Sequence, residues 1–177
     1  MPFRENTTRT NIILTGFMAT GKTTIGKLLA EQLGYEFVDT DDFIEGRCGR
    51  TVAEIFQEKG ETAFRAMETE VARELGKRGG LVIATGGGLV LNPLNVTTLE
   101  RQGRIFCLVA TPGDILERAS CDTKVRPLIQ GTNPEERITE LMQDRKEAYS
   151  HFTQVETTGK TPDEVAAMLL SRICHET

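Results

Sequence analysis

The sequence lacks the features of a membrane-spanning, secreted or nucleic-acid-binding protein. No apolar run approaches the ~18 residues that a membrane-spanning helix needs, and residues 1–10 form a polar tail without the apolar segment of a secretion signal. Lys and Arg number 21 against 26 Asp and Glu, a formal net charge of −5. General attraction to nucleic acid or to an anionic membrane surface is therefore not expected. We expect a cytoplasmic protein that binds neither and holds any anion through local groups.

Patterned cysteines and domain linkers are also missing. The four cysteines show no CxxC pairing, and Cys107 lies in the apolar run IFCLVA, where a thiol packs as a small hydrophobic side chain. Neither a disulfide framework nor a zinc site is indicated. No internal repeat, low-complexity tract or Pro-, Gly- or Ser-rich linker divides the chain. The 177 residues therefore predict one domain, 1–177, long enough to bury a core without cross-links.

What is present is an alternation of short apolar runs with helical patterns. The runs are rich in branched residues and lack polar alternation, which is typical of strands buried on both faces. They lie at 11–15, 35–38, 81–85, 104–110 and, more weakly, 153–157. Helix boundaries are indicated by Gly34, by a capping box of Thr51 and Glu54, and by Asn-Pro or Thr-Pro pairs at 92–93, 111–112, 133–134 and 161–162. This predicts an α/β protein with a mostly parallel sheet, helices on both faces, and ligands at the carboxyl ends of the strands.

A phosphate-binding loop directly follows the first apolar run. Residues 16–23, GFMATGKT, fit the pattern GxxxxGK[ST] and open an amphipathic helix. Backbone N–H groups there can surround a di- or triphosphate, Lys22 can reach its β and γ oxygens, and the Thr23 hydroxyl can bind Mg²⁺. A chance match would occur in roughly one such sequence in 200, so we expect ATP or GTP with magnesium. The expected nucleotide-binding residues of the loop are Gly16, Ala19, Thr20, Gly21, Lys22, Thr23 and Thr24.

Acidic residues follow the second apolar run, where a parallel sheet would place them across from the phosphate loop. Asp39 and Asp41 lie in the segment DTDD. One carboxylate could hold magnesium through its water, and the other could accept or orient the proton of an attacking hydroxyl. The alternative is a helix N-cap with an acidic first turn. Taken alone, the segment favours the cap.

Three further features each have a functional and an ordinary explanation. The segment TGGG, with Gly86, Gly87 and Gly88, could let backbone N–H groups approach a ligand, or could be a tight turn. Arg65 and Arg145 could bind an anion, or form surface ion pairs. Residues 120–133 are polar, with Lys124 and Arg126 in a basic stretch. They fit a lid that brings an arginine to a transferring phosphoryl group, or an exposed loop.

Together, GFMATGKTT, FVDTDDFIE, FR at 64–65, TGGG, VRPL and RKEAY resemble the shikimate kinase family in order and approximate spacing, over nearly the whole chain. The resemblance implies a phosphate-loop kinase fold in three layers, α/β/α, with a five-stranded parallel sheet and a lid. It also implies transfer of the γ-phosphoryl of ATP to the 3-hydroxyl of shikimate, in the synthesis of chorismate and aromatic amino acids. We expect a monomer.

The resemblance also implies roles for residues on the substrate side. Asp41 would bind the shikimate hydroxyls and orient or deprotonate the nucleophile, and Arg65 and Arg145 would clamp the carboxylate. The glycines Gly86–Gly88 would line the substrate, with the Gly87 backbone bonded to a ring hydroxyl. Two planar guanidinium groups suit a carboxylate, and an acidic protein needs such local clamps to hold an anion.

On the nucleotide side, the resemblance places Asp39 at the magnesium shell and Arg126 of the lid at the phosphates. Arg126 would act in catalysis together with Asp41 and Lys22. Arg118 and Lys160 would lie near the adenine, and Lys160 matches a variable position. Family loops usually have glycine at the position of Ala19, where we expect a negative φ that alanine adopts without strain.

Two alternatives remain. One is a kinase for another small acid such as gluconate, or for a nucleoside monophosphate, which Arg65, Arg145 and TGGG together disfavour. The other is a regulatory nucleotide-binding module without catalysis. Such a module would not need to retain Lys22, Asp41 and Arg126 together.

Overall fold

A five-stranded parallel sheet forms the centre of the chain, in a computed structural model that describes residues 9–121 and 133–175. The strands are β1 Asn11–Gly16, β2 Glu36–Asp39, β3 Leu81–Ala84, β4 Gly103–Val109 and β5 Thr153–Glu156. Their order in the sheet is β2-β3-β1-β4-β5, and every pair is parallel. Each predicted strand is present, with boundaries within one residue of those expected.

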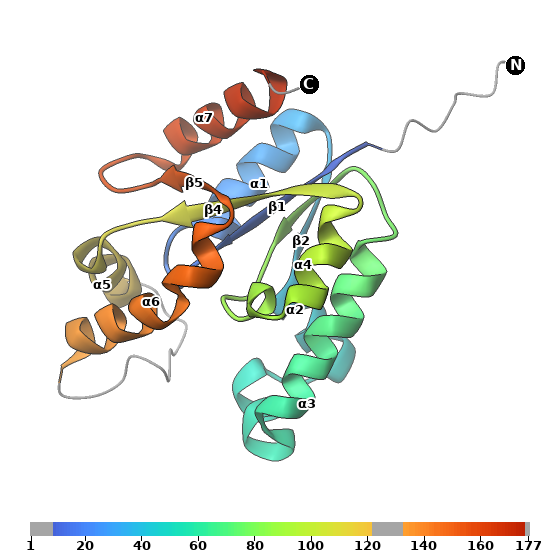
Figure 1. The fold of residues 1–177 in the computed structure, drawn as a ribbon, viewed down its shortest axis with the longest axis vertical. Helices are drawn as coiled ribbons and strands as arrows, with labels where there is room; N and C mark the ends of the chain where they lie inside the picture. The colour runs from blue at the N-terminus through green and yellow to red at the C-terminus, as the bar shows by residue number, and fades with distance from the viewer. Residues whose placement is uncertain (1–8, 122–132, 176–177) are drawn as a thin grey trace, which may run out of the picture.

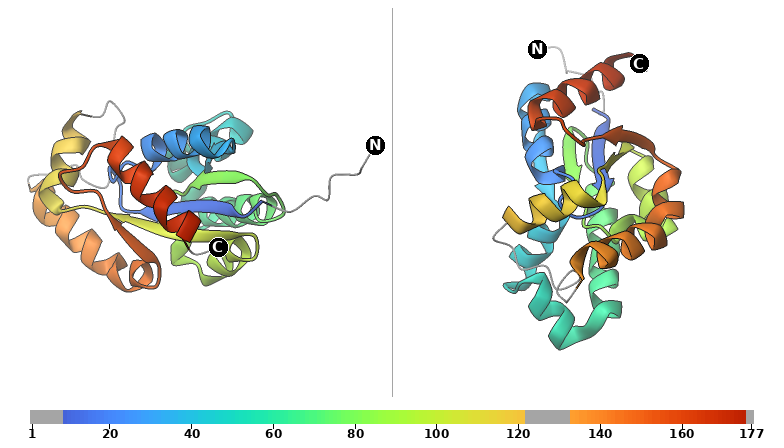
Figure 2. Two further views of the ribbon diagram at one scale, coloured as in Figure 1. Left: turned by 90° about the horizontal axis from the view of Figure 1, so that it is seen from above. Right: turned by 90° about the vertical axis from the view of Figure 1, so that its left-hand side faces the viewer.

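Helices connect the strands and cover both faces of the sheet (Figures 1 and 2). They are α1 Lys22–Leu33, α2 Thr40–Cys48, α3 Val52–Leu75, the 3₁₀ helix η1 Leu89–Leu91, α4 Pro93–Glu100, α5 Pro112–Cys121, α6 Pro134–Ser150 and α7 Pro162–His175. None of these helices is long and apolar enough to cross a membrane. The predicted three-layer α/β/α architecture is confirmed.

The branched residues of the strands pack on both sides of the sheet. Along β1, Ile12 and Leu14 belong to a core with α1 and α7, whereas Ile13 belongs to a core with α2, α3, α4, α5 and α6. All three side chains are at most 2% exposed. A strand covered on both faces must be apolar at every position, which explains why the runs show no polar alternation.

The predicted helix boundaries are also present. Gly34 follows α1 in the left-handed conformation, and the Thr51 hydroxyl and Glu54 form a reciprocal capping box at the start of α3. Proline is the first residue of α4, α5, α6 and α7. Inside α3, Gly60 has φ 80° and ψ 171°, so the helix is interrupted there.

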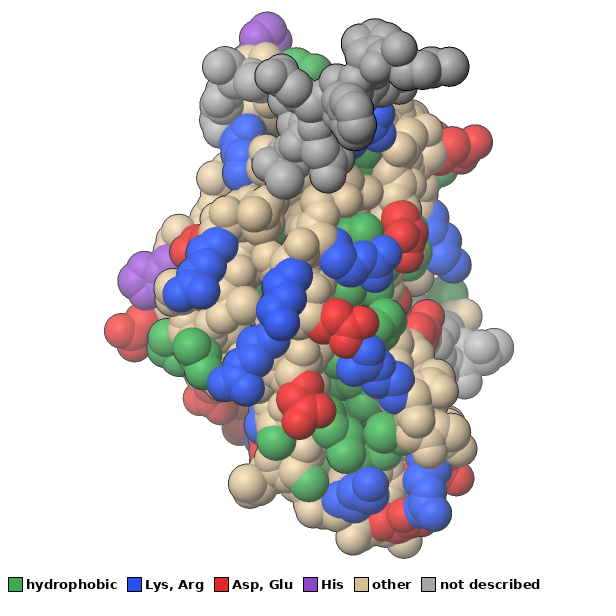
Figure 3. Space-filling model, turned by 90° about the vertical axis from the view of Figure 1, so that its right-hand side faces the viewer, with side chains coloured by type: hydrophobic (Ala, Val, Ile, Leu, Met, Phe, Trp, Pro, Cys, Tyr) green, Lys and Arg blue, Asp and Glu red, His purple; other side chains and the backbone are tan. Residues whose placement is uncertain are grey.

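The strand order places three functional segments side by side at one edge of the sheet. The phosphate loop follows β1, the glycine turn follows β3, and the first turn of α2, with Asp41, follows β2. Because parallel strands end at the same edge, segments that are far apart in sequence meet there. On the face shown in Figure 3, basic and acidic side chains are interspersed and do not form a continuous basic surface.

Candidate active site

The phosphate loop between β1 and α1 is closed by its own hydrogen bonds. The Lys22 ammonium donates to the carbonyl oxygens of Gly16 and Phe17 at 2.9 and 2.8 Å, and the Thr20 hydroxyl donates to Phe17 O at 2.8 Å. The N-cap residue of α1, Gly21, provides no side-chain hydrogen bond to the first turn. The first turn of α1 thus lacks a side-chain cap at the end where the helix dipole favours an anion. Thr24, exposed, lies in the same turn.

Gly16 shows why the loop needs glycine at its start. Its φ is 134°, and a Cβ there would collide with the carbonyl oxygen of Leu108 in the adjacent strand β4. Any side chain at this position would push the loop away from the sheet.

The expectation of a negative φ at Ala19 is wrong. Ala19 has φ 59°, the only positive value among the described non-glycine residues. The loop turns back from the strand into the helix within a few residues, and the left-handed conformation at Ala19 is part of that turn. For a residue with a Cβ this conformation costs about 1–2 kcal/mol.

Ala19→Gly is therefore expected to stabilise the protein. Relief of about 1–2 kcal/mol of strain exceeds the ~0.4–1 kcal/mol lost through the more flexible unfolded chain. A thermal unfolding scan should show a Tm about 1–4 °C higher. The control is Ala167→Gly at an exposed position in α7, which should lower the Tm because helical alanine has no strain to relieve. A lower Tm for both variants would contradict the assignment of strain.

Asp39 caps a helix with one carboxylate oxygen and contacts the phosphate loop with the other. Its Oδ1 accepts from the N–H groups of Asp41 and Asp42 at 3.0 and 3.4 Å, so it caps α2. Its Oδ2 accepts from the Thr23 hydroxyl of the phosphate loop at 2.9 Å. The cap holds the carboxylate in place. The second contact places a carboxylate oxygen and a hydroxyl oxygen side by side at the edge of the phosphate loop, and Mg²⁺ prefers oxygen ligands of this type.

Asp41 lies in the first turn of α2 and faces the glycine turn. Its Oδ1 is buried without a hydrogen-bond partner among the described residues, and a Cβ on Gly86 would collide with that oxygen. Burial raises the pKa of Asp41 from 3.8 to about 6, with further contributions from the negative charges of Asp39 and Glu68, partly offset by Lys22. Asp41 thus has the properties of a proton acceptor poised near neutral pH.

The two arginines complete the ring around the glycine turn. A Cβ on Gly88 would collide with the Arg65 guanidinium, and one on Gly87 would lie 2.9 Å from Nη1 of Arg145. The three successive glycines therefore face Asp41, Arg145 and Arg65 in turn. Side chains from α2, α6 and α3 converge on one point, and only glycine leaves the backbone accessible there.

Arg65 is held by more than a surface ion pair. It contacts the exposed Glu61 at 3.0 Å, as the ordinary explanation predicted, but also Glu68 at 2.8 Å. Glu68 is only 1% exposed, and burial raises its pKa although Arg65 counteracts the shift. Arg145 lies over the Phe17 ring, with its Cζ 5.5 Å from the ring centroid. Each guanidinium is thus fixed by a partner before any ligand binds.

Sequence reasoning missed three contacts in the site: Glu68 with Arg65, Phe17 with Arg145, and Tyr149 with Gly87. Glu68 follows Arg65 by three residues on one helix, and Tyr149 follows Arg145 by four. Both spacings place side chains on one helix face, which was the only available signal. The Tyr149 hydroxyl donates to the Gly87 carbonyl at 2.6 Å. Nothing in the sequence indicated that Phe17 would lie beneath Arg145.

The residues expected near the adenine lie at one loop. Arg118 of α5 donates from Nη1 to the Thr157 hydroxyl at 3.0 Å and from Nη2 to the Thr157 carbonyl at 2.9 Å. The Lys160 N–H donates to the same carbonyl at 3.2 Å. Lys160 is therefore part of the loop after β5, and Arg118 contacts that loop from α5. Arg126 and the expected lid, apart from 120–121 and 133, lie outside the described residues.

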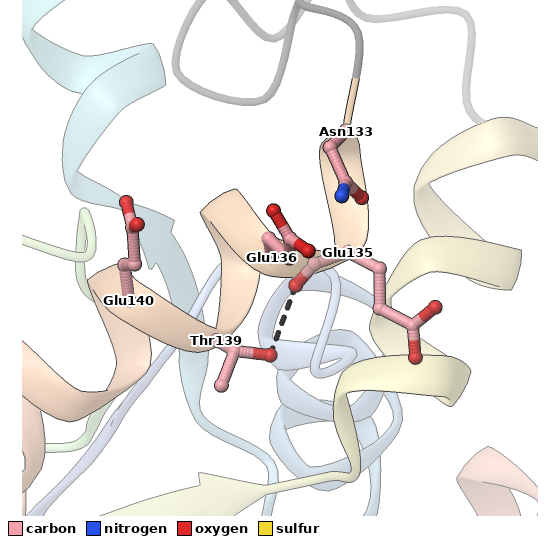
Figure 4. A pocket seen from close by; sticks show the side chains of 5 residues that line it. All are labelled: Asn133, Glu135, Glu136, Thr139 and Glu140. Atoms are coloured by element: carbon pink, nitrogen blue, oxygen red, sulfur yellow. Dashed lines mark hydrogen bonds between the residues drawn. The ribbon is translucent and has the colours of Figure 1, made fainter.

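A hollow of about 540 Å³ lies elsewhere, at the start of α6 (Figure 4). It is lined by Asn133, Glu135, Glu136, Thr139 and Glu140. Its three carboxylates would repel phosphate and the substrate carboxylate. Within the described ranges, no three His, Cys, Asp or Glu residues are grouped to hold a metal ion. The hollow is therefore not assigned to the site.

The fold and the site together define a phosphate-loop kinase for a small molecule. The family model for shikimate kinase matches residues 18–174. A shikimate kinase of Thermodesulfovibrio yellowstonii is 47% identical over 161 residues, 90% of this chain and 92% of that relative. One of Geobacter sulfurreducens is 44% identical over 156 residues, 88% of this chain and 86% of that relative. The chain belongs to the shikimate kinase family.

Solved structures agree with this membership. A shikimate kinase from Acinetobacter baumannii in complex with shikimate has a TM-score of 0.89 and 37% identity, with 97% of each chain covered. A gluconokinase from Sinorhizobium meliloti has a TM-score of 0.58 and 14% identity, over 96% of this chain and 98% of that one, so it shares the fold alone.

Proposed function

We propose that this chain transfers the γ-phosphoryl group of ATP to the 3-hydroxyl of shikimate, giving shikimate 3-phosphate and ADP, in the synthesis of chorismate and aromatic amino acids. The observation that carries the proposal is the glycine turn, whose three residues face one carboxylate and two guanidinium groups. Shikimate offers the complementary groups, a carboxylate and ring hydroxyls. Its carboxylate would bind Arg65 and Arg145, and its hydroxyls would bind Asp41 and the backbone of the turn.

The backbone of the turn has donors for such hydroxyls. The Gly86 N–H donates to the Thr40 hydroxyl at 2.9 Å. Within residues 9–121 and 133–175, the N–H groups of Gly87 and Gly88 have no acceptor. We therefore assign the Gly87 N–H to a ring hydroxyl, and Asp41 to the hydroxyl that attacks the phosphoryl group.

Two charges would act on the transfer itself. Asp41 would orient the attacking hydroxyl and accept its proton, and the Lys22 ammonium would stabilise negative charge on the β and γ oxygens. Phosphoryl transfer requires mainly positioning and charge neutralisation, so no covalent enzyme intermediate is needed. Arg118 and Lys160 would lie near the adenine, and Arg126 would meet the phosphates. The loop residues that would bind the phosphates are Gly16, Ala19, Thr20, Gly21, Lys22, Thr23 and Thr24.

The residues at the phosphate loop fit a magnesium ion. Thr23 and Asp39 bring a hydroxyl and a carboxylate within 2.9 Å of each other beside the loop, and these two residues would hold the ion, Asp39 through water. Bound there, Mg²⁺ would neutralise charge on the β and γ phosphates. We further propose that the protein is a cytoplasmic monomer.

The test is ADP release with Mg-ATP across a panel of acceptors containing shikimate, gluconate and nucleoside monophosphates. Activity on shikimate alone is expected. Preference for gluconate or a nucleoside monophosphate would reassign the acceptor, and binding of ATP without turnover on any acceptor would favour a regulatory module.

A further inference from the structure

Tyr149 connects α6 to the glycine turn. It is 7% exposed, near the end of α6, and its hydroxyl donates to the Gly87 carbonyl at 2.6 Å across 62 residues of sequence. A phenol buried to this extent needs a partner for its hydroxyl. The partner of the Tyr149 hydroxyl is the glycine turn, which the proposed function assigns to substrate binding.

Each peptide group of the turn is fixed by a different hydrogen bond. The Gly86 N–H is held by Thr40 at 2.9 Å, and the Gly86 carbonyl accepts from the Leu89 N–H at 3.2 Å. The Gly87 carbonyl is held by Tyr149. The first two contacts fix the peptides that precede Gly87, which leaves the peptide between Gly87 and Gly88 to the tyrosine.

Glycine makes that third contact necessary. A peptide flanked by two glycines can rotate between conformations that a Cβ would forbid. Because a trans peptide is planar, fixing the Gly87 carbonyl also fixes the Gly88 N–H on the opposite side. That peptide lies between the glycine that faces Arg145 and the glycine that faces Arg65, so its orientation affects the space between the two arginines.

The tyrosine and Arg145 are positioned by the same helix. A Cβ on Gly87 would lie 2.9 Å from Arg145 Nη1 and 3.7 Å from the Tyr149 oxygen. The two side chains therefore meet at Gly87, one helical turn apart on α6. A movement of α6 would shift the carboxylate clamp and the turn together.

We propose that Tyr149 is a positioning residue that sets the orientation of the peptide between Gly87 and Gly88, and thereby the fit of the acceptor. This rests on the proposed function for the identity of the acceptor. Tyr149 acts through the backbone of the turn and not by direct contact with shikimate, so its removal affects the acceptor and leaves the nucleotide side intact.

The test is Tyr149→Phe, which removes only the hydroxyl, beside Tyr35→Phe as a matched control. Tyr35 is the second of the chain's two tyrosines and lies after α1, at the opposite edge of the sheet, against Arg9. In Tyr149→Phe the KM for shikimate should rise about 3- to 10-fold, because the variant loses the hydrogen bond to the Gly87 carbonyl and the contact of the phenol oxygen with Arg145. The KM for ATP should stay within about 1.5-fold, and Tyr35→Phe should match the wild type in both.

A second readout does not depend on activity. In ¹⁵N-glycine-labelled full-length protein without ligand, Tyr149→Phe should increase the amide mobility of Gly88, while Tyr35→Phe should not. This measurement decides the positioning role even if the wild type fails to phosphorylate shikimate, a result that would overturn the proposed function alone.

Three outcomes would overturn the proposal. One is an unchanged KM for shikimate in Tyr149→Phe. Another is an equal rise in both KM values, which would indicate a general structural role. The third is unchanged Gly88 mobility. If Tyr149→Phe does not fold, the Tyr149 side-chain resonance is followed in Tyr35→Phe, where it is the only tyrosine. It should shift with shikimate and not with Mg-ADP, and the reverse result would overturn the proposal.

Discussion

Replacement of Asp41 by asparagine is expected to lower kcat with shikimate by ~10²- to 10⁴-fold while the affinity for Mg-ATP stays within about two-fold. Asparagine keeps the shape of the side chain but cannot accept the hydroxyl proton. The measurement is steady-state ADP release beside calorimetric titration with the nucleotide. Asp42→Asn, at the next and exposed position of the same helix turn, is the matched control and should keep near-normal turnover.

The pH dependence provides an independent check on Asp41. Because burial raises its pKa to about 6 in the free protein, kcat/KM for shikimate should rise with pH through about 6 as the carboxylate forms. This rise of kcat/KM near pH 6 should disappear in Asp41→Asn. Normal turnover in this variant would instead leave Asp41 as an acidic residue that complements the dipole of α2.

The raised pKa of Asp41 also predicts that this residue contributes less to the stability of the folded protein at neutral pH than at low pH. The folded pKa lies above the unfolded value of 3.8, so the folded protein binds more protons than the unfolded chain between these values. The stability from neutral Asp41 is complete below pH 3.8 and is lost as the pH rises through about 6, an effect of roughly 2–3 kcal/mol. Asp41→Asn should therefore unfold at a higher temperature than the wild type at pH 7.

Lys22→Ala is expected to lower turnover by ~10²-fold or more with the fold retained. The ammonium supplies positive charge to oxygens that become more negative during transfer. It donates to the loop carbonyls of Phe17 and Gly16 at 2.8 and 2.9 Å, and it is not one of the buried core residues. The measurements are kcat and a circular dichroism spectrum.

The control for this variant is Lys27→Ala. Lys27 is exposed on the same helix, and its removal should leave turnover close to the wild-type value. Near-normal turnover in a folded Lys22→Ala protein would remove the lysine from the proposed transfer.

Much of the fold could be predicted because its determinants are local. Strands such as 11–15 and the Thr51 capping box depend on nearby residues, and the phosphate loop is a contiguous motif. Ala19 could not be predicted correctly, because its φ depends on how tightly the loop turns between β1 and α1. An alanine by itself favours a negative φ, so the residue type alone predicts the wrong sign.

The candidate site was predicted residue by residue but not as an arrangement. The resemblance named Arg65 and Arg145, yet their convergence on adjacent glycines depends on the packing of α3 and α6 around the turn. Glu68 was missed because a glutamate on a helix with exposed charges normally faces water, whereas this one is 1% exposed. Asp39 had been given two competing explanations, and its two oxygens allow both at once.

The central claim is that the two arginines bind the substrate carboxylate. Its most direct test is calorimetric titration of shikimate into Arg145→Lys, with Mg-ADP titrated separately and Arg137→Lys, exposed near the start of the same helix, as control. A bidentate contact shielded from water contributes ~1.5–3 kcal/mol, and lysine cannot reproduce the planar guanidinium, so shikimate affinity should fall by up to roughly 10- to 150-fold. Mg-ADP affinity should barely change, and Arg137→Lys should bind both ligands normally. Unchanged shikimate affinity with weakened Mg-ADP binding would make Arg145 a phosphate ligand and contradict the account.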